Sequence, residues 1–344
     1  MLHIKIFRIY SRVRVVFKAL SFIIVIVVIA ASIFAHSIQR YVNNPINESG
    51  EYLEIVVDTG ASFSHVTNKL ASEGFITRPF YFKLLAMYEE KTQKIKPGEY
   101  RLSSSNTPSE ILNSLVNGET IQYRLTIVEG KKFQDFYQQL LNHPKIERTI
   151  EEISEIKSRL EINQESLEGL FLPETYTFTA GTHDIDIVRQ SYLLLRNFLD
   201  QEWPRRSEST LVTSPYEALI LASIVEKETS VEEERARIAG VFISRLKINM
   251  PLQTDPTVIY GLGDSFDGNL TRKHLETDNP YNTYTRRGLP PSPIALVGKA
   301  AILAVLHPDI TGDLYFVSKK DGTHYFSKTY EEHLSAVRKY QLGK

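Results

Sequence analysis

The chain has 344 residues, of which 24% are charged, a formal net charge of -1 and no cysteine. A balanced charge gives no electrostatic bias toward nucleic acid, so we expect no nucleic-acid partner. The absence of cysteine excludes disulfides, thiol catalysis and thiolate metal sites together, so the fold depends on its apolar core without disulfide support.

The N-terminal segment predicts a membrane anchor. Residues 1–18 carry five basic side chains and no acidic one. Residues 19–35 are apolar except for two serines, and a helix of this length reaches roughly 25 Å, which suffices to span a bilayer. A cleaved signal peptide has a shorter apolar core of about 7–15 residues. We therefore predict a basic cytoplasmic segment at 1–18 and an uncleaved single-pass transmembrane helix at 19–38.

The basic residues also predict the orientation of the chain. Positive flanks remain in the cytoplasm, so we expect the N-terminus inside and everything after Arg40 on the periplasmic or outer side of the cytoplasmic membrane. Residues 39–52 contain Pro, Gly, Ser and several Asn, a composition typical of a linker. The roughly 300 residues beyond the anchor favour two domains over one.

A small mixed domain is predicted at residues 53–122. The stretch "YLEIVV" alternates and is β-branched, which predicts a strand, and a helix that ends before Gly74 follows. The next helix is expected to have Thr77 as its N-cap and a buried side made of Phe80, Leu84 and Leu85.

A turn and a second strand, "KPGEYRL", complete a strand–helix–helix–strand order in this domain. A further helix should begin at the N-cap Thr107, with Glu110 closing a capping box, and end at Gly118. The order of these elements resembles a LysM module, a type that binds N-acetylglucosamine polymers. A plain spacer is the alternative.

A larger region is predicted at residues 123–344. Tyr123, Leu125 and Ile127 alternate, which predicts a strand at its start. Residues 137–168 are strongly charged, and we interpret them as a solvated helical insertion. Apolar and aromatic character returns at residues 169–178.

The stretch "SPYEALILASIVEKET" predicts a buried central helix at residues 215–229. Ser214 fits the N-cap and Glu217 the capping box. Seven consecutive apolar or small residues leave the helix no polar face, so it should lie in the core. A second helix is expected to follow directly, with Ser230 as its N-cap and Glu233 as the capping-box partner.

Glu226 and Glu228 lie at the end of this central helix. The partial negative charge of a helix C-terminus and burial both raise the pKa of a carboxyl, and a second carboxyl raises it further. A glutamic acid that keeps its proton near neutral pH can act as a general acid for glycosidic cleavage. Glu228 lies over the apolar positions of Ile224 and Val225, so we favour it as the general acid/base. Glu226 is the fallback, or a supporting carboxylate that pairs with an arginine of the next helix.

Two polar and aromatic stretches are predicted to be loops: residues 250–263, which are turn-rich, and residues 278–294, which have little capacity for regular structure. Loops of this composition are usually functional, although a proline-stiffened surface loop is the alternative. Their amide, hydroxyl and ring groups suit sugar hydroxyls and acetamido groups. The predicted substrate-binding residues are Gln253, Thr254, Asp255, Tyr260, Asn282 and Tyr284.

The C-terminal segment predicts a hairpin that turns at Asp321-Gly322, followed by a helix with Leu334, Val337 and Tyr340 toward the core. The whole pattern predicts an α+β fold: an N-terminal single-pass helix, a small LysM-like domain, and a larger domain whose buried helix bears the catalytic glutamate. The histidines form no i,i+4 pair, and no HExxH, Walker or GxSxG motif occurs, so we expect no metal and no cofactor.

Four separate blocks carry a resemblance to a known family: "LASIVEKET", "FISRLKINMPLQTDPTVIYGLG", "YNTYTRRGLPPSPI" and "LYFVSKKDGTHYFSKT". In this order they resemble the MltG/YceG-like family of membrane-anchored endolytic murein transglycosylases, over essentially the whole exported chain. The resemblance implies that the second glutamate of the E-K-E motif, Glu228, is catalytic. The charged stretch at 145–168 is the least family-like part.

The resemblance implies cleavage of peptidoglycan glycan strands between N-acetylmuramic acid and N-acetylglucosamine. Glu228 would protonate the bridging oxygen, and the muramoyl 6-hydroxyl would attack its own C1 to leave a 1,6-anhydro end. It also implies a role in terminating nascent strands, with peptidoglycan synthases as partners. Two other functions stay open: a two-carboxylate hydrolase using Glu174, Asp255 or Asp278 as the second group, and a non-catalytic, membrane-tethered peptidoglycan-binding protein.

Overall fold

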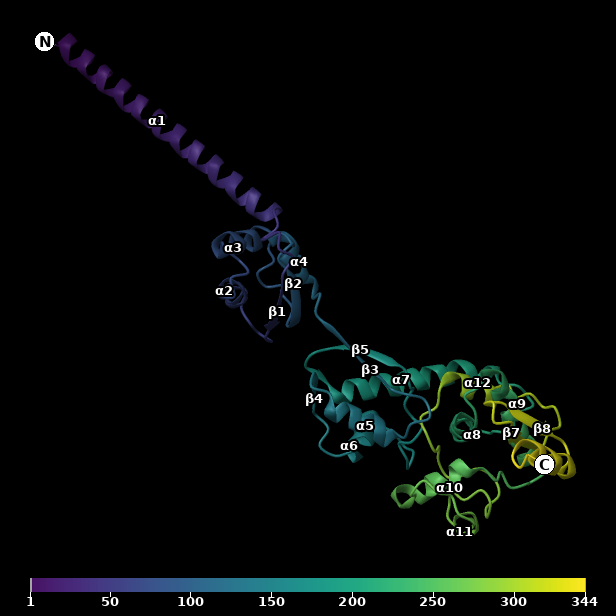
Figure 1. The fold of residues 1–344 in the computed structure, drawn as a ribbon. Helices are drawn as coiled ribbons and strands as arrows, with labels where there is room; N and C mark the ends of the chain where they lie inside the picture. Colours follow the sequence, from purple (N-terminus) through teal and green to yellow (C-terminus); the bar gives the residue numbers. More distant parts are fainter. Residues whose placement is uncertain (1, 344) are drawn as a thin grey trace. The chain divides into compact units, whose positions relative to one another are not determined.

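The computed structural model of the protein describes residues 2–343. The side chains of residues 2–13, 15 and 16 are outside the described ones, so the predicted basic segment at 1–18 lies largely outside the described residues. The chain divides into two compact units, Met1–Gln122 (unit 1) and Tyr123–Lys344 (unit 2). Both contain helices and strands (Figure 1), so the predicted α+β class is confirmed.

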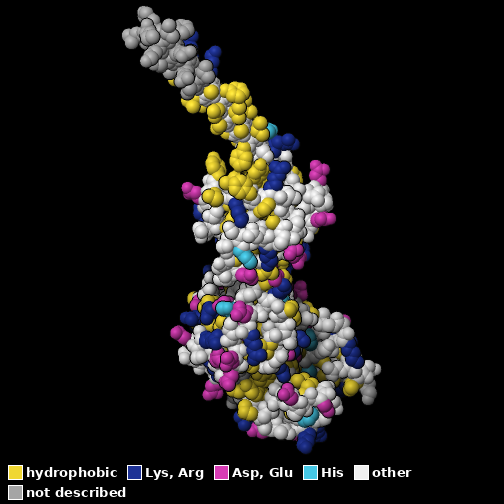
Figure 2. Space-filling model, turned by 90° about the vertical axis from the view of Figure 1, so that its left-hand side faces the viewer, with side chains coloured by type: hydrophobic (Ala, Val, Ile, Leu, Met, Phe, Trp, Pro, Cys, Tyr) yellow, Lys and Arg dark blue, Asp and Glu magenta, His cyan; other side chains and the backbone are white. Residues whose placement is uncertain are grey.

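Unit 1 begins with the long helix α1, Leu2–Asn43. Its segment Phe17–Asn43 has a mean hydropathy of 2.6 and is the one helix among the described residues that is long and apolar enough to cross a membrane. Figure 2 shows hydrophobic side chains around this exposed part of α1. The helix continues through residues 39–43, which we had predicted as linker, because Tyr41 and Val42 pack against the core of unit 1.

The rest of unit 1 has the predicted strand–helix–helix–strand order, followed by a further helix. Strands β1 and β2 pair antiparallel, with Ile55 opposite Tyr100. Thr107 and Glu110 form the predicted capping box, and Gly118 ends the last helix in the left-handed conformation. The elements are β1 (Tyr52–Val57), α2 (Phe63–Ser72), α3 (Pro79–Tyr88), β2 (Gly98–Ser103) and α4 (Pro108–Asn117).

The start of α3 differs from its prediction. Arg78, not Thr77, occupies the N-cap, because Pro79 takes the first helical position that proline favours. This shift turns Phe80 outward, where it is 61% exposed. The buried side of the helix consists of Phe82, Leu85 and Ala86.

Unit 2 is mainly helical, with three two-stranded ladders: β3 with β5, β4 parallel with β6, and β7 antiparallel with β8. The hairpin around Asp321-Gly322 is confirmed by the β7–β8 pair. The elements are β3 (Gln122–Thr126), α5 (Phe133–Asn142), β4 (Ile146–Glu147), α6 (Ser154–Leu160), β5 (Thr175–Thr179), β6 (Thr182–His183), α7 (Asp184–Glu202), the 3-10 helix η1 (Trp203–Arg205), α8 (Pro215–Glu228), α9 (Glu232–Lys247), α10 (Asp255–Leu262), the 3-10 helix η2 (Gly263–Ser265), α11 (Arg272–Glu276), α12 (Lys299–Leu306), β7 (Tyr315–Ser318), β8 (His324–Ser327) and α13 (Tyr330–Tyr340).

The charged segment 137–168 is not the solvated helical insertion that we predicted. It contains the end of α5, the short strand β4 and the seven-residue helix α6. Ile150 and Ile156 are fully buried in the core of unit 2. The carboxylate of Asp184 accepts hydrogen bonds from the backbone amides of Thr149 (3.0 Å) and Ile150 (3.1 Å), which ties the segment to the start of α7.

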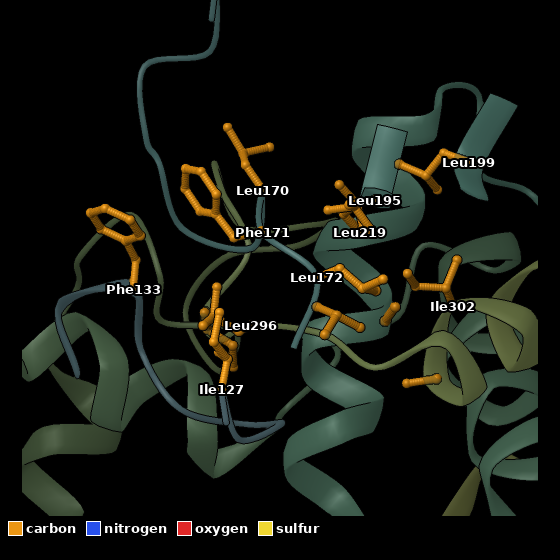
Figure 3. Close-up of a cluster of buried hydrophobic side chains, with 14 of the residues drawn as sticks. Ile127, Phe133, Leu170, Phe171, Leu172, Leu195, Leu199, Leu219, Leu296 and Ile302 are labelled. Carbon is orange, nitrogen blue, oxygen red and sulfur yellow. The ribbon is translucent and has the colours of Figure 1, made fainter. Parts of the chain in front are cut away.

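The centre of unit 2 is α8, which contacts α9 and α12. All eight residues of 218–225 are buried, so the predicted core helix is confirmed. Figure 3 shows part of this core, where Leu172, Leu219 and Ile302 meet from segments that are far apart in the sequence. The buried oxygen of Ser223 accepts a hydrogen bond from the backbone amide of Ile294 (3.0 Å), which fixes the irregular stretch 278–294 against α8.

Candidate active site

The capping residues of α8 determine where this helix begins and ends, and so where its C-terminal glutamates lie. Ser214 is the N-cap, and its Oγ accepts a hydrogen bond from the backbone amide of Glu217 (3.2 Å). The predicted capping box is wrong, because the Glu217 carboxylate instead accepts from the amide and hydroxyl of Thr213 (2.6 and 2.7 Å). The helix ends at Glu228, with Thr229 as its C-cap.

The turn after α8 also differs from its prediction. The N-cap of α9 is Val231, and Ser230 is exposed. The Thr229 hydroxyl accepts a hydrogen bond from the Val231 amide (3.0 Å), so Thr229 organises this turn in the place of Ser230. The predicted Ser230–Glu233 capping box is therefore wrong. The tight connection between α8 and α9 is nevertheless retained.

Glu228 lines an open pocket of about 520 Å³ in unit 2. Its walls come from the end of α8, from α9, from residues 252–255, from the β7–β8 hairpin and from α13. They combine carboxyl, amide, hydroxyl and aromatic groups. The polar and aromatic lining residues are Glu228, Arg245, Gln253, Thr254, Asp255, Tyr284, Tyr315, Phe316, Ser318, His324, Tyr330, His333 and Gln341.

Burial is the main reason why the pKa of Glu228 is raised above its usual value. The nearby Asp255 carboxylate raises it further. The Thr254 hydroxyl, which donates a hydrogen bond to Glu228 Oε1, opposes the shift, as do the electrostatic interactions with His324 and Arg245. Glu228 therefore keeps its proton to a higher pH than an exposed glutamic acid.

Glu226 has a different environment, although it is two positions away. Its Oε1 lies 3.7 Å from Arg235 Nη2, and its Oε2 accepts a hydrogen bond from the Gly298 amide (3.1 Å). This confirms the expected pairing with an arginine of the next helix. Burial, followed by the neighbouring Glu129, raises its pKa. Glu226 does not line the pocket of Glu228.

The structure brings four of the six predicted substrate-binding residues into the pocket: Gln253, Thr254, Asp255 and Tyr284. The Tyr284 hydroxyl donates a hydrogen bond to Asp255 Oδ1 (2.6 Å). The stretch that we predicted as a loop is partly the helix α10, with Thr254 as its N-cap and Asp255 as its first residue. The start of this helix therefore places both side chains beside Glu228.

The other two predicted residues, Tyr260 and Asn282, do not line the pocket. Asn282 is fully buried, and its side-chain amide donates to backbone carbonyls, including that of Thr277 (2.7 Å). It therefore shapes the stretch 278–294 from inside. The Tyr260 hydroxyl donates to Glu168 Oε2 (3.3 Å), so Tyr260 serves the attachment of α10.

Of the three conceivable second carboxylates, only Asp255 lies in the pocket. Glu174 forms an ion pair with Lys299 (2.8 Å), and both side chains are about half exposed. Asp278 forms an exposed ion pair with Arg286 (2.8 Å), and the hydrogen bonds from Arg286 lower its pKa to about 2. Among the described residues, no group of three or more His, Asp or Glu side chains could hold a metal ion.

Sequence reasoning missed Arg245 and His324 of the pocket wall. Arg245 is buried, and its guanidinium donates to the backbone carbonyls of Leu314 (2.7 Å) and Leu252 (2.6 Å), which join two walls. His324 Nδ1 lies 2.7 Å from the carboxylate of Glu234 on α9. Two features of the sequence could have indicated these residues. Arg245 interrupts the apolar residues of a core helix, and His324 follows the turn of the predicted hairpin.

These features together describe the class to which the protein belongs. The chain is a mixed α+β protein with an apolar N-terminal helix, and its larger unit has an open, polar and aromatic pocket around one glutamic acid of raised pKa.

Comparison with known proteins gives the family. The profile of the YceG-like family matches residues 55–339, so the chain belongs to this family. An endolytic murein transglycosylase of Bacillus subtilis is 30% identical over 317 residues, covering 86% of this chain and 87% of the relative. A protein of the same name from Streptococcus pneumoniae is 26% identical over 321 residues, covering 83% of this chain and 58% of that relative. The crystal structure of a YceG-like protein of Listeria monocytogenes matches 84% of this chain and 100% of its own, with 30% identity and a TM-score of 0.51.

Proposed function

We propose that this chain is a membrane-anchored endolytic lytic transglycosylase that cleaves peptidoglycan glycan strands. The observation that carries the proposal is the carboxyl of Glu228, which lies in the pocket with a raised pKa and a hydrogen bond from Thr254. The names of the relatives from B. subtilis and S. pneumoniae support the same reaction class. The pocket lining suits a sugar substrate, because hydroxyl and amide groups hydrogen-bond sugars and aromatic rings stack on them.

The proposed reaction needs one carboxyl that acts twice. Glu228 gives its proton to the oxygen between N-acetylmuramic acid and N-acetylglucosamine, and the bond from this oxygen to C1 of the muramic acid breaks. The Glu228 carboxylate then takes the proton of the muramoyl 6-hydroxyl as that oxygen bonds to C1. The product has a 1,6-anhydro end, no water is consumed, and the glutamic acid is regenerated.

The remaining parts of the chain fit an anchored enzyme with its pocket outside the cytoplasm. In the proposal, α1 spans the cytoplasmic membrane with its N-terminus inside, and unit 1 acts as a LysM-like glycan-binding domain. A pocket of about 490 Å³ between the segments that follow β1 and precede β2 supports this role of unit 1. An anchored enzyme beside peptidoglycan synthases would terminate nascent strands as they leave the membrane.

The test is the variant Glu228→Gln, which keeps the shape of the side chain and removes its proton. We expect nearly complete loss of cleavage of defined glycan strands, measured by mass spectrometry of the products, with unchanged circular dichroism. Glu226→Gln is the matched control, because Glu226 belongs to the same motif but lies outside the pocket. Full activity of the Glu228 variant would refute the assignment.

A two-carboxylate hydrolase is the second candidate, because Asp255 lies in the same pocket as Glu228. The products separate the two reactions: anhydro ends support the transglycosylase, and reducing ends support the hydrolase. A non-catalytic binding protein would retain glycan strands and release no product from them.

A further inference from the structure

Unit 1 has a second pocket, of about 510 Å³, at the end of the apolar helix α1. Four parts of the chain form it: the last turns of α1, the residues that follow them, the two residues before α3, and the first residue of α4. The lining residues are Ile33, His36, Ser37, Arg40, Tyr41, Asn44, Pro45, Ile46, Thr77, Arg78 and Pro108. No aspartate or glutamate is among them, whereas two arginines and a histidine are.

The arginine from the globular part is held against the helix. Arg78 Nη1 donates a hydrogen bond to Ser37 Oγ of α1 (3.3 Å), and its guanidinium lies 5.4 Å from the centre of the Tyr81 ring. The other arginine, Arg40, is exposed one turn further along α1. The hydroxyl of Tyr41 is buried and has no hydrogen-bond partner among the described residues. The pocket therefore combines two arginines, of which Arg78 is held in place, with the hydroxyl of Tyr41, a hydrogen-bond donor that has no partner among the described residues.

The pocket also lies at the depth of the lipid headgroups if α1 spans the membrane. The apolar run ends at Ala35, and five more residues of helix place Arg40 about 8 Å beyond it. The headgroup layer on each side of the hydrocarbon core is about 5–8 Å thick. The Tyr81 ring contacts Phe34 and Tyr41 edge to face, at 5.8 and 5.7 Å. Aromatic residues are enriched at this interface of membrane proteins.

We propose that this pocket binds the phosphate of an acidic phospholipid headgroup. Two guanidinium groups can form charge-assisted hydrogen bonds to phosphate oxygens. Without a carboxylate in the wall, a zwitterionic lipid finds no partner for its positive group, so the net-negative headgroup is preferred. Ile33 and the apolar surface of α1 lie on the membrane side, where the acyl chains begin. The inference rests on the membrane-anchoring part of the proposed function and is independent of Glu228.

The experiment uses the full chain in mild detergent with equimolar phosphatidylglycerol and phosphatidylcholine, and native mass spectrometry counts the lipid that stays bound. The wild type should retain phosphatidylglycerol in preference to phosphatidylcholine. Loss of each arginine should weaken this preference about fivefold, in Arg40→Gln and more strongly in Arg40→Gln/Arg78→Gln. Lys69→Gln/Lys94→Gln removes two positive charges from unit 1 outside the pocket and should leave the preference unchanged.

Equal retention of both lipids by the wild type would overturn the proposal, as would an undiminished preference in Arg40→Gln, whose exposed side chain can be replaced without disturbing the core. Displacement of phosphatidylglycerol by inorganic phosphate would assign the pocket to soluble phosphate instead. Two further measurements distinguish a failure of the lipid-binding proposal from a failure of the proposed enzymatic function. Release of the chain from membranes by alkaline carbonate would refute the anchor, and glycan cleavage by the double variant should remain that of the wild type.

Discussion

Glu226 and Glu228 share one sequence motif but lie in different surroundings. Two positions on an α-helix differ by about 200° in direction, so the two carboxyls leave opposite sides of α8. Glu226 reaches Arg235 and the Gly298 amide, whereas Glu228 reaches the pocket and Thr254. The helix geometry thus separates a carboxylate with structural partners from a carboxyl that is accessible to a ligand.

The first residue-scale prediction concerns Thr254, whose hydroxyl stabilises the charged form of Glu228. Thr254→Val keeps the shape and removes the donor, so the pKa of Glu228 should rise further. We expect the alkaline limb of the pH dependence of kcat/KM to move to higher pH. Thr257→Val is the control, because Thr257 bonds to Thr254 and Thr283 but not to Glu228. A limb that stays in place in Thr254→Val would contradict the proposed role of Glu228.

The second prediction concerns Asp255, whose replacement should lower the pKa of Glu228. The charge of Asp255 raises the pKa of Glu228, so Asp255→Asn should move the same alkaline limb to lower pH. The Asn oxygen can still accept the hydrogen bond from Tyr284. If one carboxyl suffices for the reaction, kcat should fall by no more than about tenfold. A hydrolase that needs Asp255 as base or nucleophile would instead lose activity about as completely as Glu228→Gln, a loss of about 10²- to 10⁴-fold.

At the scale of elements, α8 provides the rigid support of the pocket. Its buried run packs against α9 and α12, and Ser223 attaches the stretch 278–294 to it. The position of Glu228 then depends on where α8 ends and how the chain turns into α9. Thr229 and Val231 determine this turn.

This turn gives a matched pair of variants for a stability measurement. Ser214 caps α8, so Ser214→Ala should lower the free energy of unfolding of unit 2 by about 1 kcal/mol. Ser230 is exposed and caps no helix, so Ser230→Ala should change it by less than about 0.5 kcal/mol. Urea unfolding can be followed by the fluorescence of Trp203, the single tryptophan of the chain, which lies in unit 2. An equal loss of unfolding free energy in both variants would instead support Ser230 as the N-cap of α9, as the sequence predicted.

At the scale of the whole molecule, the buried carboxyl of Glu168 contributes to the pH dependence of the stability of unit 2. Glu168 is 6% exposed, and it accepts hydrogen bonds from the Phe133 amide (2.8 Å) at the start of α5 and from Tyr260 of α10 (3.3 Å). Burial raises its pKa from the usual 4.5 to about 7. The unfolded chain therefore releases this proton at a lower pH than the folded one.

The stabilisation that comes from protonated Glu168 is complete below pH 4.5 and is lost as the pH rises through about 7. Glu168→Gln keeps both hydrogen bonds possible and cannot ionise. Between pH 5 and pH 8, the wild type should therefore lose about 2–4 kcal/mol of unfolding free energy relative to this variant. The measurement is urea unfolding of the full chain in detergent, followed by Trp203 fluorescence. Parallel pH profiles of the two proteins would contradict the raised pKa.

The local patterns of the sequence were sufficient for the apolar span, the mixed class, the strand–helix–helix–strand order of unit 1 and the buried helix α8. Each of these follows from neighbours along the chain: an apolar run, alternation, or a capping residue next to a periodic segment. The same kind of reasoning failed where two local signals competed. At α3 the proline outweighed Thr77, and at α9 the chain used Val231 instead of Ser230.

The amino-acid sequence by itself determined which groups are available for chemistry: no thiols, a long apolar N-terminal segment, and a pair of glutamates at the end of a largely apolar helix. Only the tertiary structure decided which of these groups meet. It placed Asp255 and Thr254 beside Glu228, and it placed Asn282 and Tyr260 elsewhere. The physical reason is that helical periodicity depends on adjacent residues, whereas a pocket depends on contacts between segments that are distant in the chain. Those contacts set the burial and the neighbouring charges that raise the pKa of Glu228.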